Sequence, residues 1–133
     1  MTFKNRKASV SFLYGAMFSQ KPMEKAVIDH ICLDIEVICP VTKNYLGRPW
    51  LTLLIDVYSR RVLAYYLSIE PPSYVSIMMT LRESVRKNSM IPKTLLKCDA
   101  KRFQSENLDK LIVALDIKSK LFQKMNFQFT RDC

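Results

Sequence analysis

The fold is decided by the stretch Leu46-Gly47-Arg48-Pro49-Trp50-Leu51-Thr52-Leu53-Leu54-Ile55-Asp56-Val57-Tyr58-Ser59-Arg60-Arg61. It opens with a Gly-Arg-Pro turn, continues as a short and almost wholly apolar run, and closes with a Tyr-Ser-Arg tight turn. A short apolar run between two turn signals predicts a buried central strand. Residues 61–69, rich in Val, Leu and Tyr, predict the strand that returns beside it. The stretch therefore predicts a β-hairpin inside a larger sheet.

A further strand is predicted upstream, over residues 27–37. Apolar and polar residues alternate there with a period of two, which places Asp29 on a mostly apolar face and His30 on the opposite one. Pro40 ends this strand, and residues 42–49 predict a polar turn that leads into the hairpin. Together the three strands predict an antiparallel meander.

Helices and strands alternate downstream of the meander. Residues 73–88 predict a helix with a serine N-cap, and residues 94–98 predict a short buried strand with Asp99 at its end. A second helix over 105–115 and a fifth strand over 117–122 complete the order. A meander followed by helix-connected strands is an α/β fold with a mixed sheet. A ligand site is expected at the carboxyl ends of the strands, where Asp99 stands.

The chain has 133 residues, which suits a single domain. Residues 24–122 contain every predicted element and form the expected folded core. Residues 1–23 are basic and weakly patterned, which predicts an N-terminal arm or the remnant of a linker. Residues 123–133 show no clear period and predict an irregular tail.

Charge points to a class of partner. The formal net charge is +9, and such an excess favours polyanions, of which nucleic acid is the commonest. A basic protein without a polyanionic partner is the alternative interpretation. The chain has only two glycines, Gly15 and Gly47, which argues against a glycine-rich phosphate-binding loop.

The cysteines indicate neither a zinc site nor a disulfide framework. No pair of the four cysteines has CxxC spacing and His30 is the only histidine, so a zinc site is not expected. Cys32 and Cys98 lie in apolar runs and are interpreted as small buried hydrophobic residues in a reducing compartment. No signal-peptide core and no apolar run of membrane-spanning length occurs, so no membrane association and a cytoplasmic location are expected.

Several charged residues are candidates for chemistry. A buried carboxylate needs a hydrogen-bonding partner or a metal, so Asp29 and Asp99 are either metal ligands or structural hydrogen-bond acceptors. Asp56 precedes a tight turn, and we expect its carboxylate to bind the turn backbone. Four basic residues are candidate phosphate contacts, with solvated surface as the alternative: Arg48, Arg60, Lys101 and Arg102.

Three segments, taken together, resemble a known family. These are residues 27–34, with Asp29 and His30 followed by Leu33-Asp34; residues 47–73, from Gly-Arg-Pro-Trp to Glu-Pro-Pro-Ser; and residues 98–105, which contain Asp99. In this order they resemble the integrase-type catalytic core of DDE transposases, in the branch of the Mu transposase and TnsB. The resemblance covers residues 24–122 and implies a ribonuclease H-like fold.

The resemblance implies an activity, a cofactor and partners. Members of this family cut DNA and transfer its strands with two Mg²⁺ ions held by carboxylates. It assigns the first two catalytic and metal-binding carboxylates to Asp29 and Asp99. It implies DNA as partner, both transposon ends and target, together with a second copy of the chain or other transposition proteins.

The sequence departs from the family at the third carboxylate. The family has a glutamate on a helix beyond the second aspartate, whereas no glutamate follows Glu106 in this chain. We therefore expect a truncated or frameshifted core with impaired activity. Two alternatives stay open: a non-catalytic module that binds DNA or a transposase partner, and a ribonuclease H-like nuclease that cuts without joining.

Overall fold

The structure is a computed structural model that describes residues 19–98 and 105–122. The predicted tail and most of the predicted N-terminal arm fall outside these ranges, as do Asp99, Lys101 and Arg102. In chain order the elements are β1 (Lys25–Cys32), β2 (Val37–Ile38), β3 (Tyr45–Gly47), β4 (Trp50–Asp56), β5 (Val62–Ser68), α2 (Tyr74–Asn88), β6 (Thr94–Cys98), α3 (Glu106–Ala114) and β7 (Lys118–Phe122).

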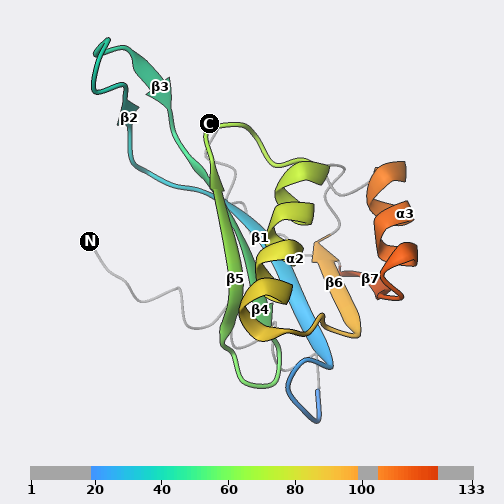
Figure 1. Ribbon diagram of the computed structural model, residues 1–133. Helices are drawn as coiled ribbons and strands as arrows, with labels where there is room; N and C mark the ends of the chain where they lie inside the picture. The colour runs from blue at the N-terminus through green and yellow to red at the C-terminus, as the bar shows by residue number, and fades with distance from the viewer. Residues whose placement is uncertain (1–18, 99–104, 123–133) are drawn as a thin grey trace.

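A five-stranded sheet with the order β5-β4-β1-β6-β7 forms the body of the molecule (Figure 1). β1, β4 and β5 are antiparallel neighbours and make the predicted meander. β6 pairs parallel with β1, and β7 pairs parallel with β6, each reached through a helix. The predicted mixed sheet is therefore confirmed, and it places β1 at the centre between β4 and β6.

The main core lies between this sheet and the helices α2 and α3. Buried residues of both helices join those of the strands in one cluster, so α2 and α3 cover the same face of the sheet. The cluster consists of Ala26, Ile28, Leu54, Leu63, Ile77, Leu81, Leu95, Leu108, Ile112 and Ile117. Each fully buried Leu or Ile stabilises the fold by about 1.5–3 kcal/mol relative to exposure.

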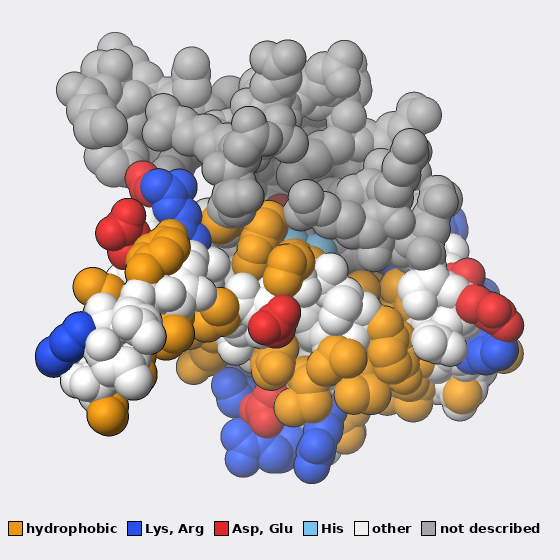
Figure 2. All heavy atoms as spheres, turned by 90° about the horizontal axis from the view of Figure 1, so that it is seen from above, with side chains coloured by type: hydrophobic (Ala, Val, Ile, Leu, Met, Phe, Trp, Pro, Cys, Tyr) orange, Lys and Arg blue, Asp and Glu red, His pale blue; other side chains and the backbone are white. Residues whose placement is uncertain are grey.

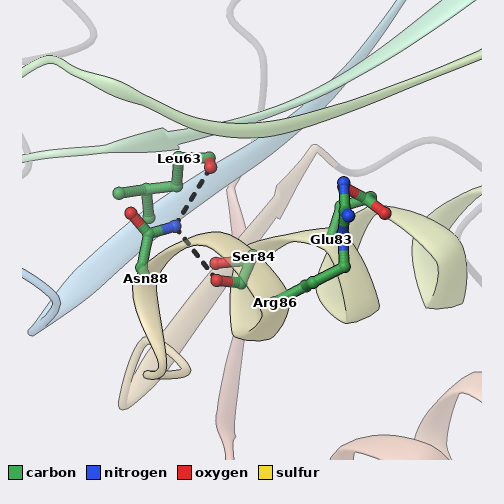
Figure 3. A network of polar contacts seen from close by, with 5 residues as sticks. All are labelled: Leu63, Glu83, Ser84, Arg86 and Asn88. Atoms are coloured by element: carbon green, nitrogen blue, oxygen red, sulfur yellow. Dashed lines mark hydrogen bonds and ion pairs between the residues drawn. The ribbon is translucent and has the colours of Figure 1, made fainter.

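Helix α2 begins where the sequence predicts. The Ser73 side chain accepts a hydrogen bond from the N–H of Val75, and the Ser76 hydroxyl accepts one from the N–H of Ser73, which forms a capping box. At the other end the Asn88 amide donates to the carbonyls of Leu63, at 3.1 Å, and Ser84, at 3.0 Å (Figure 3). The helix is thus anchored at one end to the edge strand β5.

Residues 33–49 differ from the prediction. β1 ends at Cys32, which pairs with Trp50, rather than at Val37. The residue that would pair next is Pro49, which has no N–H to continue the hydrogen-bond ladder. The N–H of Leu33 donates to the Pro49 carbonyl at 2.9 Å and closes the base of a separate hairpin that contains β2 and β3. We call residues 33–49 the projecting hairpin, since it extends beyond the sheet (Figure 1).

Two further expectations about β1 are corrected. The deeply buried face is that of Ala26 and Ile28, which pack under the helices, whereas Asp29 lies on the opposite, half-buried face. Strand alternation was predicted correctly, but periodicity alone does not say which face meets the helices. Cys32 is half-buried and takes part in a disulfide, so its interpretation as a buried free thiol is wrong.

Candidate active site

Asp29 lies on the central strand of the sheet. Its backbone is level with Leu53 of the antiparallel neighbour β4, and its side chain is half-buried. One carboxylate oxygen, Oδ1, accepts a hydrogen bond of 2.9 Å from the N–H of the next residue, His30. This bond holds the carboxylate against its own strand and so limits the rotamers that it samples.

The other neighbour of β1 is β6, the strand that leads to the second predicted aspartate. Ile28, the residue before Asp29, is level with Lys97 of β6 in the parallel register, and β6 ends at Cys98, the residue before Asp99. As neighbouring strands of one sheet, β1 and β6 have backbones about 4.8 Å apart. Asp99 itself is outside the described residues, and its role remains a prediction.

Asp29 is the one predicted metal ligand that lies among the described residues. Carboxylate oxygens are the hard ligands that Mg²⁺ prefers, and one carboxylate satisfies only a small part of its coordination. Within residues 19–98 and 105–122 no group of three His, Cys, Asp or Glu side chains gathers into a metal-binding cluster. A third protein ligand is therefore not found among these residues.

Behind Asp29, on the helix-covered face, a polar pair joins β1 to β4. The His30 Nδ1 and the Thr52 Oγ1 lie 2.8 Å apart, and Thr52 is buried. His30 is thus a packed residue, as its position opposite Asp29 predicts, and it fixes the β1–β4 register one residue from the carboxylate. The only signal for its partner was a threonine inside an otherwise apolar strand.

Sequence reasoning missed an ion pair beside the site. Lys97 is buried on β6, and its Nζ lies 3.6 Å from the Asp109 Oδ1 on α3. A buried ammonium is costly without a counter-charge, so the pair ties α3 to β6 directly before Cys98. A lysine within a short apolar strand is the signal that points to such a pair.

Asp56 has the structural role predicted for it. It is fully buried at the opposite end of β4, where Oδ1 accepts from the N–H of Met23 at 2.9 Å. Oδ2 accepts from the backbone N–H of Ser59 at 2.8 Å and from the Ser59 hydroxyl at 2.6 Å. The carboxylate therefore organises the β4–β5 turn and the chain that enters β1.

The predicted phosphate contacts do not form a single patch among the described residues. Arg48 lies at the base of the projecting hairpin, before β4, and its guanidinium is 3.4 Å from the Asp34 carboxylate. Arg60 lies in the turn after β4, with a positive φ of 60°, at the other end of that strand. Lys101 and Arg102 lie outside the described residues.

No helix within the described ranges is both long and apolar enough to cross a membrane.

A family model and a curated relative match this chain. The model of the TnsB C-terminal domain matches residues 27–128. The transposase for transposon Tn552 of Staphylococcus aureus is 31% identical over 110 residues, a match that spans 77% of this chain and 22% of the relative. The chain thus covers about a fifth of the length of that protein.

Solved structures share the fold. The catalytic core domain of HTLV-2 integrase, in a dimeric form with magnesium, has a TM-score of 0.60 at 12% identity and covers 75% of this chain and 61% of its own. A chain of the simian T-cell lymphotropic virus intasome in complex with the PP2A subunit B56 gamma has a TM-score of 0.58 at 11% identity, covering 76% and 32%. These likenesses confirm the α/β, ribonuclease H-like layout predicted from the sequence.

Proposed function

Because this chain belongs to the TnsB C-terminal domain family, we propose that it is a catalytic-core fragment of a DNA transposase or integrase. It binds DNA and takes part in magnesium-dependent cleavage and strand transfer during DNA integration. The observation that supports the proposal is the parallel register of β1 and β6, in which Ile28, the residue before Asp29, pairs with Lys97, two residues before Asp99. A transposase at 31% identity supports the same reaction class.

Each part of the site has its own task in this proposal. Asp29 and Asp99 supply the metal-binding carboxylates, and the N–H of His30 holds Asp29 in place. Bound Mg²⁺ activates the attacking oxygen and stabilises the leaving one. The Lys97–Asp109 pair and the His30–Thr52 bond fix the strands on either side, because misplacing a ligand by about 1 Å is costly in rate.

Catalysis by this chain alone is expected to be weak. Only two carboxylates are assigned among these 133 residues. Fewer charged ligands hold the metal less tightly. We therefore propose a core that binds metal and DNA and is impaired in turnover.

DNA is the partner that the charge favours. The chain carries 21 basic and 12 acidic residues, and such an excess attracts the phosphate backbone regardless of sequence. Arg48, Arg60, Lys101 and Arg102 are the proposed contacts. Of these, Arg60 is exposed in the β4–β5 turn.

The test separates metal binding from turnover. The thermal unfolding of the purified chain is measured with and without 10 mM Mg²⁺, which is roughly the millimolar range in which weakly charged sites bind. Its strand transfer on a short DNA duplex is measured in parallel. We expect Mg²⁺ to raise the Tm of the wild type. Asp29→Asn and Asp99→Asn should weaken Mg²⁺ binding more than about tenfold, because each removes a charged ligand.

Asp116→Asn is the matched control. Asp116 is an exposed aspartate between α3 and β7 with a φ of 52°, a conformation that asparagine adopts readily, so the Mg²⁺ effect should be unchanged. Equal Mg²⁺ binding by wild type and Asp29→Asn would exclude the proposed site. Robust strand transfer that Asp29→Ala abolishes would refute the impairment, and cutting without joining would favour a nuclease. Salt-sensitive DNA binding without any Mg²⁺ effect would favour a non-catalytic module.

A further inference from the structure

The projecting hairpin, residues 33–49, is separate from the main sheet. Its strands β2 and β3 form their own two-stranded sheet, and Figure 1 shows it extending past the end of β1 and β4. Within the described part of the chain these strands pair only with each other, through Val37 with Gly47 and Ile38 with Tyr45. An isolated two-stranded hairpin is marginally stable in water, and unpaired strand edges readily accept another chain.

Large apolar side chains cover this hairpin. Ile38 and Tyr45 are cross-strand partners on one face and are 55% and 60% exposed, and Val41 near the turn is 86% exposed. Leu46 follows Tyr45 and therefore points to the other face, where it is also exposed. Figure 2 shows hydrophobic side chains on this projection at the left of the molecule. Apolar groups on both faces indicate a segment that is enclosed by protein in its working state.

The apolar surface continues from the hairpin onto the sheet. A Cβ at Gly47 would lie 3.8 Å from the Cγ2 of Ile69, so the end of the β5 segment lies against the hairpin base. Leu67 and Ile69 are both exposed there. The hairpin alone has 17 residues, fewer than the roughly 20–30 residues that each side of a standard interface contributes. With the adjoining end of β5, the surface approaches that size.

The charge of the hairpin differs from that of the rest of the chain. Residues 33–49 contain two acidic residues, Asp34 and Glu36, and two basic ones, Lys43 and Arg48, so their net charge is zero while the whole chain has +9. Nucleic acid binds through clustered positive charge, which this segment lacks. Two copies of a strongly basic chain repel each other least where both are neutral.

We propose that the projecting hairpin joins two copies of this chain. The two hairpins lie side by side around a two-fold axis, with open strand edges together and Ile38, Val41 and Tyr45 at the centre. Each copy thereby covers apolar groups that the other leaves in water. This inference goes beyond the proposed function and needs neither metal nor DNA.

Sedimentation velocity of the 133-residue chain tests the proposal. It is measured without DNA over about 1–100 µM, a range that brackets a micromolar dissociation constant for the dimer. The wild type should shift from monomer to dimer with concentration. Ile38→Thr combined with Tyr45→Thr keeps strand-forming residues and removes apolar area, and should weaken dimerisation by at least about tenfold. Val113→Thr, a change at an exposed valine on α3, should leave it unchanged.

A cross-link gives an independent reading. Cys39 is a free thiol next to the turn of the hairpin, so mild oxidation should trap a dimer that Cys39→Ser cannot form. A wild type that stays monomeric at 100 µM would overturn the proposal, and so would a dimer that the double variant leaves intact. If the double variant keeps the dimer but loses DNA binding, the occupant is nucleic acid and the proposal is wrong. Unchanged circular dichroism of the variants confirms that they fold.

Discussion

At the residue scale, Asp56 shows how much one buried carboxylate can organise. Its oxygens accept three hydrogen bonds, from the Met23 N–H and from the N–H and hydroxyl of Ser59. We expect Asp56→Ala to lower the free energy of unfolding by about 3 kcal/mol, because it leaves buried hydrogen-bond donors without an acceptor. Urea denaturation measures this. Ser59→Ala should cost less, since it removes one bond, and a loss below about 1 kcal/mol for Asp56→Ala would contradict this account.

Cys39, also at the residue scale, has a pH-dependent prediction. A hydrogen bond from the Thr42 side chain, helped by the N–H groups of Thr42 and Val41, lowers the pKa of the Cys39 thiol. The thiolate therefore forms at lower pH in the folded chain than in the unfolded one. Its stabilising effect is present above the unfolded pKa and is lost as the pH falls through the folded pKa.

The measurement is the alkylation rate of Cys39 against pH, followed on its peptide by mass spectrometry. The folded chain should reach its half-maximal rate at a lower pH than the chain in guanidinium chloride. Thr42→Val should move the folded profile back toward the unfolded one. Coinciding profiles for the folded and unfolded wild type would show that the turn does not stabilise the thiolate.

At the scale of elements, α2 packs on the sheet through small hydroxyl residues. Ser76, Thr80 and Ser84 recur every four residues and are all buried. Thr80 donates to the Ser76 carbonyl at 2.7 Å, whereas the Ser84 Oγ has no hydrogen-bond partner among the residues that the structure describes. Small side chains let the helix approach closely, at the cost of one unsatisfied hydroxyl.

Ser84→Ala should therefore raise the free energy of unfolding by about 1 kcal/mol, because it removes that desolvated hydroxyl without leaving a large cavity. Ser76→Ala is the comparison at the same face. It should lower stability by about 1 kcal/mol, since it breaks the capping box with Ser73. Urea denaturation shows whether each variant raises or lowers the free energy of unfolding. A destabilised Ser84→Ala would show that the hydroxyl has a partner.

At the scale of the whole molecule, net charge governs the proposed contact with DNA. If about five phosphates are neutralised, the logarithm of the association constant should fall with log salt at a slope near −4.5. Arg60→Ala should reduce that slope by about one and weaken all sequences alike. Fluorescence anisotropy on duplex DNA at several salt concentrations measures it.

Arg86→Ala is the control for this series. Arg86 is exposed on α2, pairs with Glu83 at 3.0 Å (Figure 3) and is not one of the four proposed phosphate contacts, so the slope should stay the same. A salt-independent affinity would contradict the electrostatic account. If Arg86→Ala changes the slope as much as Arg60→Ala, the basic surface acts as a whole and not through the β4–β5 turn.

The sequence by itself determined most elements of this protein. The strands β4 to β7 and the helices α2 and α3 follow from local signals: apolar periodicity, the Ser73 N-cap of α2 and turn residues act within a few positions of each other. The family was also visible in short motifs, and so was the role of Asp56, because a carboxylate before a tight turn bonds to that turn. These features depend on neighbours in the chain, which a sequence displays directly.

Only the tertiary structure decided which distant residues meet. Three features depend on how strands align across the sheet: the register that sets Lys97 beside Ile28, the choice of the Ala26 and Ile28 face for the helices, and the Lys97–Asp109 pair. The projecting hairpin was hidden for the same reason: β1 stops because Pro49 faces it across the ladder. Such pairings are set by packing over the whole core, and alternation along one strand does not encode them.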